Sequence, residues 1–207
     1  MQLRLTYRGP LKSHRVPKEG DSDRMAPHVH MVRRHFHRQL REFWQTNLFL
    51  KDHQSWPSDW GLPTEPSGAK IPLVDIVAQS HLGHGFRFVP LVRKVWKLEC
   101  SLSILFLRGD QPGSSLIHRG DIDNRIKTLI DSLRLPETSS EAGAAKPQND
   151  EDPFFCLLES DEFVTGLSVE TDKLLDVQPD DEDNVVSLVI CAQIKPFHVN
   201  MFNQGFL

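Results

Sequence analysis

The sequence has few cysteines, no long apolar run and no internal repeat. Its three cysteines, at positions 100, 156 and 191, are odd in number and lack metal-ligand spacing, so they read as reduced core residues. No stretch approaches the roughly 18 apolar residues that span a bilayer. The first residues lack the apolar core of a signal peptide and alternate like a strand. We therefore expect a cytoplasmic protein with no membrane contact.

The size and composition of the chain fit one globular domain. Its 207 residues, 39% hydrophobic and 25% charged, are enough to bury a single core without disulfides. We predict one domain over residues 1–207. Within it, residues 1–95 form a basic N-terminal region of strand, helix and loop, and residues 96–207 form the core region.

Charge is strongly segregated along the chain, although the net charge is only −4. Residues 1–41 hold ten Lys and Arg against three acids, and residues 137–183 hold two Lys against fifteen acids. Because salt screens remote charge beyond about 8–10 Å, a basic arm can attract a polyanion even on an acidic protein. A nucleic-acid partner is permitted, and a merely solvated basic surface is the alternative.

The N-terminal region predicts one strand and one amphipathic helix. Residues 2–8 alternate as a strand, and Pro27 suits the first turn of a helix whose apolar residues recur from Met25 to Trp44. The histidine pairs 28/30 and 35/37 are two residues apart and face different ways, so we assign them no metal. Cationic and histidine side chains occupy the other faces of this helix: Arg33, Arg34, His37, Arg38 and Arg41.

The core region predicts several strands and one further helix. Alternating or continuous apolar patterns indicate strands at 86–91, 96–106, 163–169 and 185–194. Residues 136–153 have almost nothing to bury, and we expect this acidic insertion to be disordered. The fold class is therefore α/β or α+β, with a mixed sheet of about four to six strands packed with at least two helices.

The most informative stretch runs from Gly120 to Leu133. Its apolar residues share one helical face, which places Asp123, Lys127 and Asp131 along one flank at i, i+4 and i+8, with Asp121 at the helix start. Such acids also cap helices, so a purely structural role stays open.

A metal site on this helix requires a further oxygen ligand from elsewhere, because Mg²⁺ prefers octahedral oxygen coordination. Asp161 is the candidate, since it stands directly before an alternating strand, where the sheet margin approaches a neighbouring helix. A Ser-Asp pair at a strand entry is alternatively a simple turn former.

These motifs resemble the RusA-type Holliday-junction resolvases, which are dimeric, Mg²⁺-dependent endonucleases. The resemblance includes the flanking strands 96–107 and 185–194 and so extends over about half of the chain. The matching residues are Gly120-Asp121-Ile122-Asp123-Asn124, Lys127, Asp131-Ser132-Leu133, Ser160-Asp161 and Val164.

The resemblance implies a homodimeric endonuclease that acts on branched DNA. Asp121, Asp123 and Asp161 would bind Mg²⁺ or Mn²⁺, and Lys127 would be the catalytic cation. Asn124 would help to hold the metal ligands in position, and Asp131 would orient Lys127. Surface arginines would contact the DNA backbone, and those expected to do so are Arg33, Arg34, Arg38, Arg41 and Arg125.

Two departures from the family pattern leave alternatives open. Ser160 replaces an acid, for which Glu159 or Glu162 could substitute, and the long connection before Asp161 makes Asp150 and Asp152 its rivals. A catalytically inert RusA-like module that binds nucleic acid or protein is the competing hypothesis.

Overall fold

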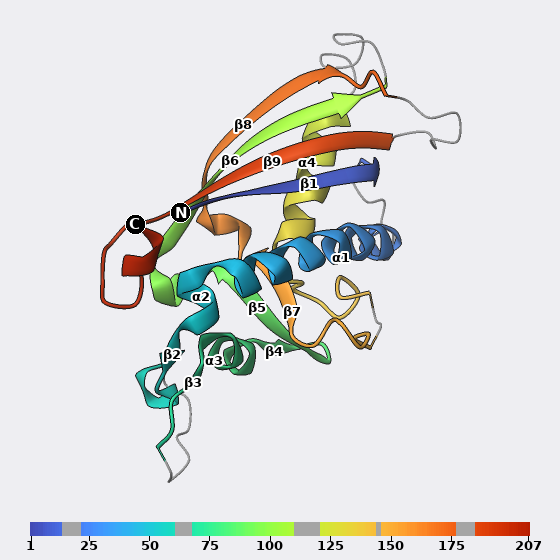
Figure 1. The fold of residues 1–207 in the computed structure, drawn as a ribbon. Coiled ribbons are helices and arrows are strands. Elements are labelled where there is room, and N and C mark those ends of the chain that lie inside the picture. The colour runs from blue at the N-terminus through green and yellow to red at the C-terminus, as the bar shows by residue number, and fades with distance from the viewer. Residues whose placement is uncertain (14–21, 61–67, 110–120, 144–145, 177–184) are drawn as a thin grey trace.

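Four strands from both ends and the middle of the chain form the principal sheet. The computed structural model describes residues 1–13, 22–60, 68–109, 121–143, 146–176 and 185–207. The strand order is β1 (Gln2–Pro10), β9 (Val185–Pro196), β6 (Leu98–Arg108) and β8 (Val164–Lys173). β9 runs antiparallel to both β1 and β6, whereas β8 is parallel to β6. This curved sheet lies above the helices in Figure 1.

A smaller sheet lies below the main helix. It pairs β5 (Phe86–Val92) in parallel with β7 (Phe154–Leu158), and β4 (Leu82–Gly83) extends it. The helices α2 (Leu48–Asp52) and α3 (Leu73–Ser80) and the pair β2 (Gln54–Ser55) and β3 (Ile71–Pro72) adjoin it. The remaining short turns are η1 (Pro57–Trp60), η2 (Lys94–Trp96), η3 (Asp161–Phe163) and η4 (Gln204–Phe206).

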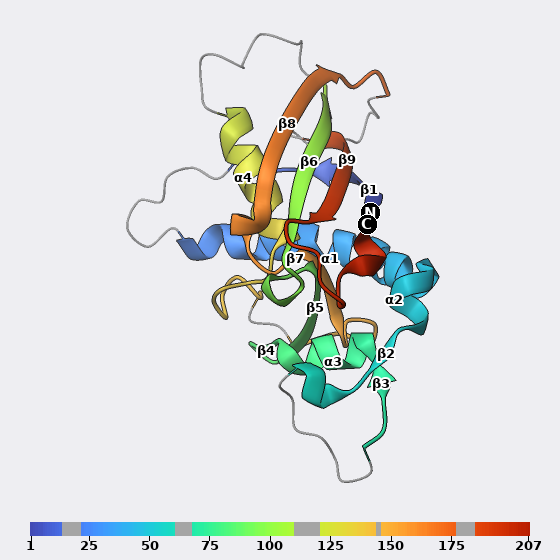
Figure 2. The same ribbon diagram turned by 90° about the vertical axis from the view of Figure 1, so that its left-hand side faces the viewer.

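Two helices pack between the sheets. α1 (Ser22–Thr46) buries Val32, Phe36, Leu40 and Trp44 at steps of four residues, which confirms the predicted apolar face. α4 (Asp121–Leu133) buries a second apolar stripe against the same core. The result is the predicted mixed α+β architecture (Figures 1 and 2). Among the described residues, no helix is both long and apolar enough to cross a bilayer.

The β6 strand shows how the sequence pattern produces the sheet. Its side chains are alternately buried and partly exposed, as a half-buried strand requires. The inward residues Leu102, Ile104 and Phe106 are at most 2% exposed and face the helices. In β8, Leu167 and Val169 pair with Leu102 and Ile104 and therefore point to the same side of the sheet.

Arg33 is buried between α1 and the end of α4, contrary to the expectation that it lies on a DNA-binding surface. Its side chain is only 1% exposed. The guanidinium donates to the backbone oxygens of Asp131, Arg134 and Glu141, at 2.7, 3.1 and 2.7 Å. These acceptors include carbonyls at the α4 terminus, which have no partner within the helix. Arg33 therefore ties α1, α4 and the following segment together.

Described parts of the acidic insertion, which the sequence predicted to be disordered over residues 136–153, contact the rest of the fold. Ala142 and Glu151 are 2% and 3% exposed, and residues 144–145 lie outside the described part. Glu151 pairs with Arg34 at 2.6 Å, and the Asp150 carbonyl accepts from Arg41 at 2.9 Å. The cationic flank of α1 supplies the partners that a composition analysis of the insertion alone does not reveal.

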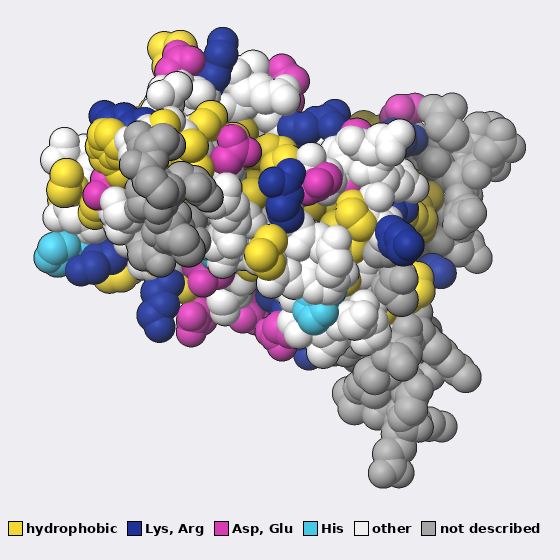
Figure 3. Space-filling model, turned by 90° about the horizontal axis from the view of Figure 1, so that it is seen from below, with side chains coloured by type: hydrophobic (Ala, Val, Ile, Leu, Met, Phe, Trp, Pro, Cys, Tyr) yellow, Lys and Arg dark blue, Asp and Glu magenta, His cyan; other side chains and the backbone are white. Residues whose placement is uncertain are grey.

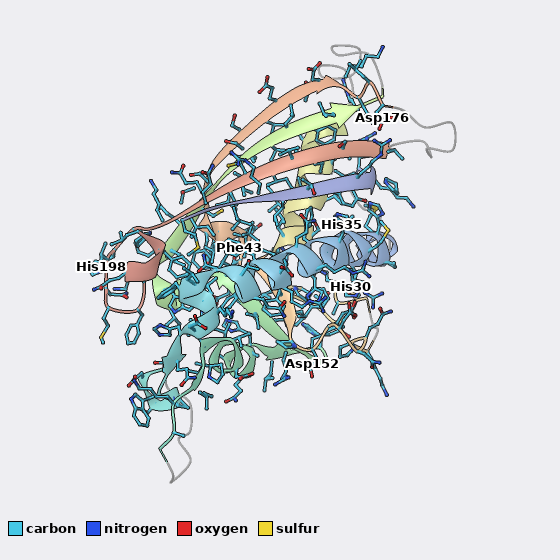
Figure 4. The ribbon with its side chains drawn as sticks, viewed as in Figure 1. His30, His35, Phe43, Asp152, Asp176 and His198 are labelled. Carbon is cyan, nitrogen blue, oxygen red and sulfur yellow. The ribbon has the colours of Figure 1, made fainter. Side chains whose placement is uncertain are left out.

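Histidines 35 and 37 face different sides of α1, as their spacing of two residues predicted. His35 lies 3.0 Å from the Thr6 carbonyl of β1, whereas His37 accepts from the Phe155 N–H of β7 at 2.9 Å. His30 lies on the side of α1 away from His35 (Figure 4). His30 packs against the rings of Phe86 and Phe154, and neither of its ring nitrogens has a hydrogen-bond partner within the described part of the chain. Burial, followed by the charges of Arg33 and Arg34, lowers the pKa of His30 to about 4.

Replacing Arg33 with Met should destabilise the protein by about 3 kcal/mol or more, because three buried carbonyls lose their donor. Urea unfolding monitored by circular dichroism measures this change. Arg38→Met is the matched control on the same helix, since Arg38 is exposed, and we expect a change within about 0.5 kcal/mol. Equal effects of both substitutions would contradict the assigned role of Arg33.

Acid should weaken the fold partly through His30. Between the unfolded pKa of 6.5 and the folded value of about 4, the unfolded chain binds more protons, so the free energy of unfolding falls as pH decreases through this window. His30→Phe removes this contribution while preserving the ring contacts. Urea unfolding at several pH values should therefore give a shallower pH dependence for the variant, and an unchanged slope would contradict the prediction.

Candidate metal centre

A groove between α4 and β8 contains four charged residues that the sequence motifs singled out. Its volume is about 380 Å³. Four charged side chains line it: Asp123, Lys127 and Asp131 from α4, and Asp161 from η3. Its apolar lining comes from both elements and consists of Ile122, Ile126, Ile130, Leu167 and Val169.

Helical periodicity explains the α4 side of the groove. Asp123, Lys127 and Asp131 recur every four residues and so form one row, as the sequence predicted. Leu129 and Leu133, fully buried on another face, fix the rotation of the helix against the core. The charged row is therefore turned toward the open side of the groove.

Asp161 comes to this groove from a separate part of the chain. The Ser160 hydroxyl accepts from the Glu162 N–H at 3.4 Å and so caps the η3 turn on which Asp161 sits. The two rivals of Asp161 lie elsewhere: Asp152 pairs with Arg87 at 2.7 Å, and Asp150 faces Arg41. Of the three alternatives, Asp161 is the one that lines the groove.

The acids are spread along the groove instead of gathering at one point. The Leu135 N–H donates to the Leu158 carbonyl at 3.0 Å, so the end of α4 lies beside the chain that leads to η3. Asp161, three residues after Leu158, thus enters near Asp131. Asp123 lies eight residues before Asp131, or about 12 Å along the helix axis.

The partners of these side chains differ. Asp131 accepts from Arg134 at 3.2 Å and is thereby held at the end of α4; its expected role in orienting Lys127 stays a prediction. Asp123, Lys127 and Asp161 are exposed to solvent, and no ion pair among the described residues involves them. They are free to meet a ligand. Asn124 is half-buried in the first turns of α4.

Glu159, one candidate for the missing family acid, is engaged elsewhere. Its carboxylate accepts from the Lys94 N–H at 2.8 Å and lies 3.9 Å from His81. Burial would raise the pKa of Glu159, but His81, the Lys94 N–H and Arg93 outweigh it and hold that pKa below its usual value. Glu162, the other candidate, is exposed on η3.

The donor chemistry of the groove suits a hard divalent cation. Mg²⁺ typically takes one or two carboxylates and completes its coordination with water and substrate phosphate, and Asp123 and Asp161 are accessible oxygen ligands. The side chain of Asp121 lies outside the described residues. Among the side chains that are described, no group of three or more His, Cys, Asp or Glu is placed to hold one metal ion.

Most of the arginines expected to bind DNA have other partners or are buried. Arg33 and Arg125 are 1% and 8% exposed, which corrects the expectation for both. Arg34 and Arg41 pair with acids of the segment before β7, and Arg38 is exposed. Among the described side chains, the predicted arginines of α1 therefore do not form a continuous exposed row. On the face seen from below, acidic and basic side chains are intermixed (Figure 3).

The sequence analysis missed the apolar half of the groove. Leu167 is 48% exposed although it points to the inner side of the sheet, because β8 is the last strand of the sheet and projects beyond the core. The alternation of β8 was visible in the sequence, but its place at the edge was not.

Comparison with known proteins identifies no relative. A scan against family models, a search of curated proteins and a search of solved structures each give no match for this chain.

Metal binding can be measured without any enzymatic assay. Titration of Mn²⁺ followed by electron paramagnetic resonance should show binding to the wild type that weakens about tenfold or more in Asp123→Asn and in Asp161→Asn, since each removes a charged ligand. Glu170→Gln is the matched control, because Glu170 is exposed on the other face of β8. Equal affinity in all four proteins would contradict a site in the groove.

Proposed function

We propose that this protein is a metal-dependent endonuclease that hydrolyses phosphodiesters in branched DNA, with Mg²⁺ or Mn²⁺ as cofactor. The observation that carries the proposal is that Asp161 lines the same groove as Asp123 and Lys127, although Asp161 is 34 residues from Lys127 in the chain. Two exposed carboxylates and an ammonium are the groups that such a reaction uses.

Each residue of the groove has a distinct part in this mechanism. The proposed ligands of divalent cations are Asp121 and Asp123 at the start of α4 and Asp161 toward the other end of the groove; the bound metal would supply an activated water and neutralise phosphate charge. Lys127 donates hydrogen bonds from its ammonium to the scissile phosphate and stabilises the charge that grows on the leaving oxygen. Arg134 holds Asp131 to one side, which leaves the Lys127 ammonium free to reach the substrate.

The symmetry of the proposed substrate matches the proposed homodimer. A four-way junction has two-fold symmetry and requires two symmetric cuts, which a homodimer with one groove per subunit would deliver. Arg38, exposed on α1, is the remaining candidate among the predicted arginines for an unshielded backbone contact.

One observation favours a second candidate, an inert RusA-like module that binds nucleic acid or protein. The described side chains do not gather three metal ligands, and Ser160, which stands where the family pattern has an acid, caps a turn. Such a module predicts binding that is indifferent to Asp123→Asn.

The deciding experiment is a Mg²⁺-dependent cleavage assay on a mobile four-way junction. We expect Asp123→Asn and Lys127→Ala to slow cleavage about 100-fold or more, because each removes charge stabilisation from the transition state. Glu170→Gln, which neutralises an exposed acid outside the groove, should cleave like the wild type.

Parallel reactions on flap, linear duplex and single-stranded DNA test the substrate class. Preference for the junction supports the proposal, whereas preference for another substrate overturns the junction assignment but keeps the nuclease. Junction binding without cleavage by the wild type, unchanged in Asp123→Asn, would establish the inert module instead.

A further inference from the structure

The two edges of the principal sheet differ in whether side chains cover their outward backbone groups. At the β1 edge, side chains of α1 occupy the outward backbone groups of Thr6. Gln39 accepts from the Thr6 N–H at 2.9 Å and donates to the Thr6 carbonyl at 2.7 Å, and His35 lies 3.0 Å from the same carbonyl (Figure 4). Covering an edge in this way prevents another strand from pairing with it.

The β8 edge has no such cover among the described residues. β8 ends the strand order, and β6 is its one partner in the sheet. The Leu174 N–H, just past β8, donates to Arg108 of β6 at 2.7 Å. Because backbone direction alternates along a strand, Leu167, Val169 and Thr171 aim their N–H and carbonyl groups away from β6. These groups form a template for a further strand.

The side of β8 that faces α4 is apolar and partly open. Leu167 and Val169 point to this side, and Leu167 is 48% exposed. The α4 helix lies across the groove from this side of β8, and its Ile122 and Ile130 are partly buried in the groove. A strand added about 4.8 Å from β8 would place alternate side chains over these four residues.

The charges around the groove indicate the chemistry of the segment that fits it. Asp123, Asp131, Asp161 and Lys127 line the groove; Arg134 pairs with Asp131 at 3.2 Å, so Asp123 and Asp161 are the lining acids that stay open to a ligand. Glu162, next to Asp161, is also acidic and exposed. Such a rim repels a phosphate backbone unless a metal ion is bound, but it attracts lysine and arginine side chains directly.

We infer that the free edge of β8 and the α4–β8 groove bind an extended, basic segment of a partner protein as an additional strand. The segment carries apolar residues at alternate positions, which fill the groove, and lysine or arginine residues that meet its acidic rim. Main-chain hydrogen bonds to β8 provide affinity, and the groove provides selectivity. This function goes beyond nuclease chemistry, because it uses the backbone of β8.

The probe for this inference is a fluorescently labelled decapeptide of alternating valine and lysine, measured by fluorescence anisotropy without nucleic acid or divalent metal. N-methylation of one alternate set of residues removes the N–H groups that face β8 and should abolish binding. N-methylation of the other set should leave binding intact, since those N–H groups face solvent.

A matched pair of variants tests the location. Leu167→Lys places a cation in the groove and should weaken binding more than about tenfold through like-charge repulsion. Ser168→Lys adds the same charge at the next residue, which is exposed on the opposite face of β8, and should have little effect. Circular dichroism and thermal unfolding verify that both variants fold like the wild type.

Hydrogen exchange gives an independent readout. Peptide binding should slow exchange at the Leu167, Val169 and Thr171 amides, whereas the amides bonded to β6 should change little. Absence of peptide binding, equal losses from the two lysine variants, or indifference to both N-methylation patterns would each overturn the inference. These outcomes are independent of the nuclease proposal, because none of the measurements involves cleavage.

Discussion

The burial of the Arg33 guanidinium against the end of α4 is the contact on which the arrangement of the groove depends. A buried cation is tolerated only when its donors are satisfied, and here three backbone carbonyls from α4 and the following segment satisfy them. The bonds hold the last turn of α4 beside α1. With that end fixed, the flank carrying Asp123 and Lys127 faces β8.

The segregation of charge along the chain serves the fold as much as any ligand. The acidic segment before β7 contacts the cationic side of α1 directly. Glu151 forms an ion pair with Arg34, and the Asp150 carbonyl is hydrogen-bonded to Arg41 and His37. Each partner lowers the cost of burying the other, since unpaired charges lose their hydration on burial. A helix that looked like a nucleic-acid surface is therefore largely an internal contact surface.

The position of β8 at the sheet edge makes the groove both accessible and exposed to competing partners. Apolar side chains that would be covered inside a sheet are left open there, beside acids that favour cations. A divalent ion and a basic peptide segment both satisfy this charge, and they would exclude one another where they use the same carboxylates.

The sequence by itself determined the local features: the apolar face of α1, the alternation of β6, and the row formed by Asp123, Lys127 and Asp131. These follow from the fixed periods of helix and strand, which act over a few residues. Tertiary structure decided that Arg33 is buried, that Asp150 and Glu151 of the acidic segment contact α1, and that Asp161 enters the groove near Asp131. Those outcomes depend on which distant segments supply hydrogen-bond partners and on the strand order of the sheet, and neither is encoded in a local pattern.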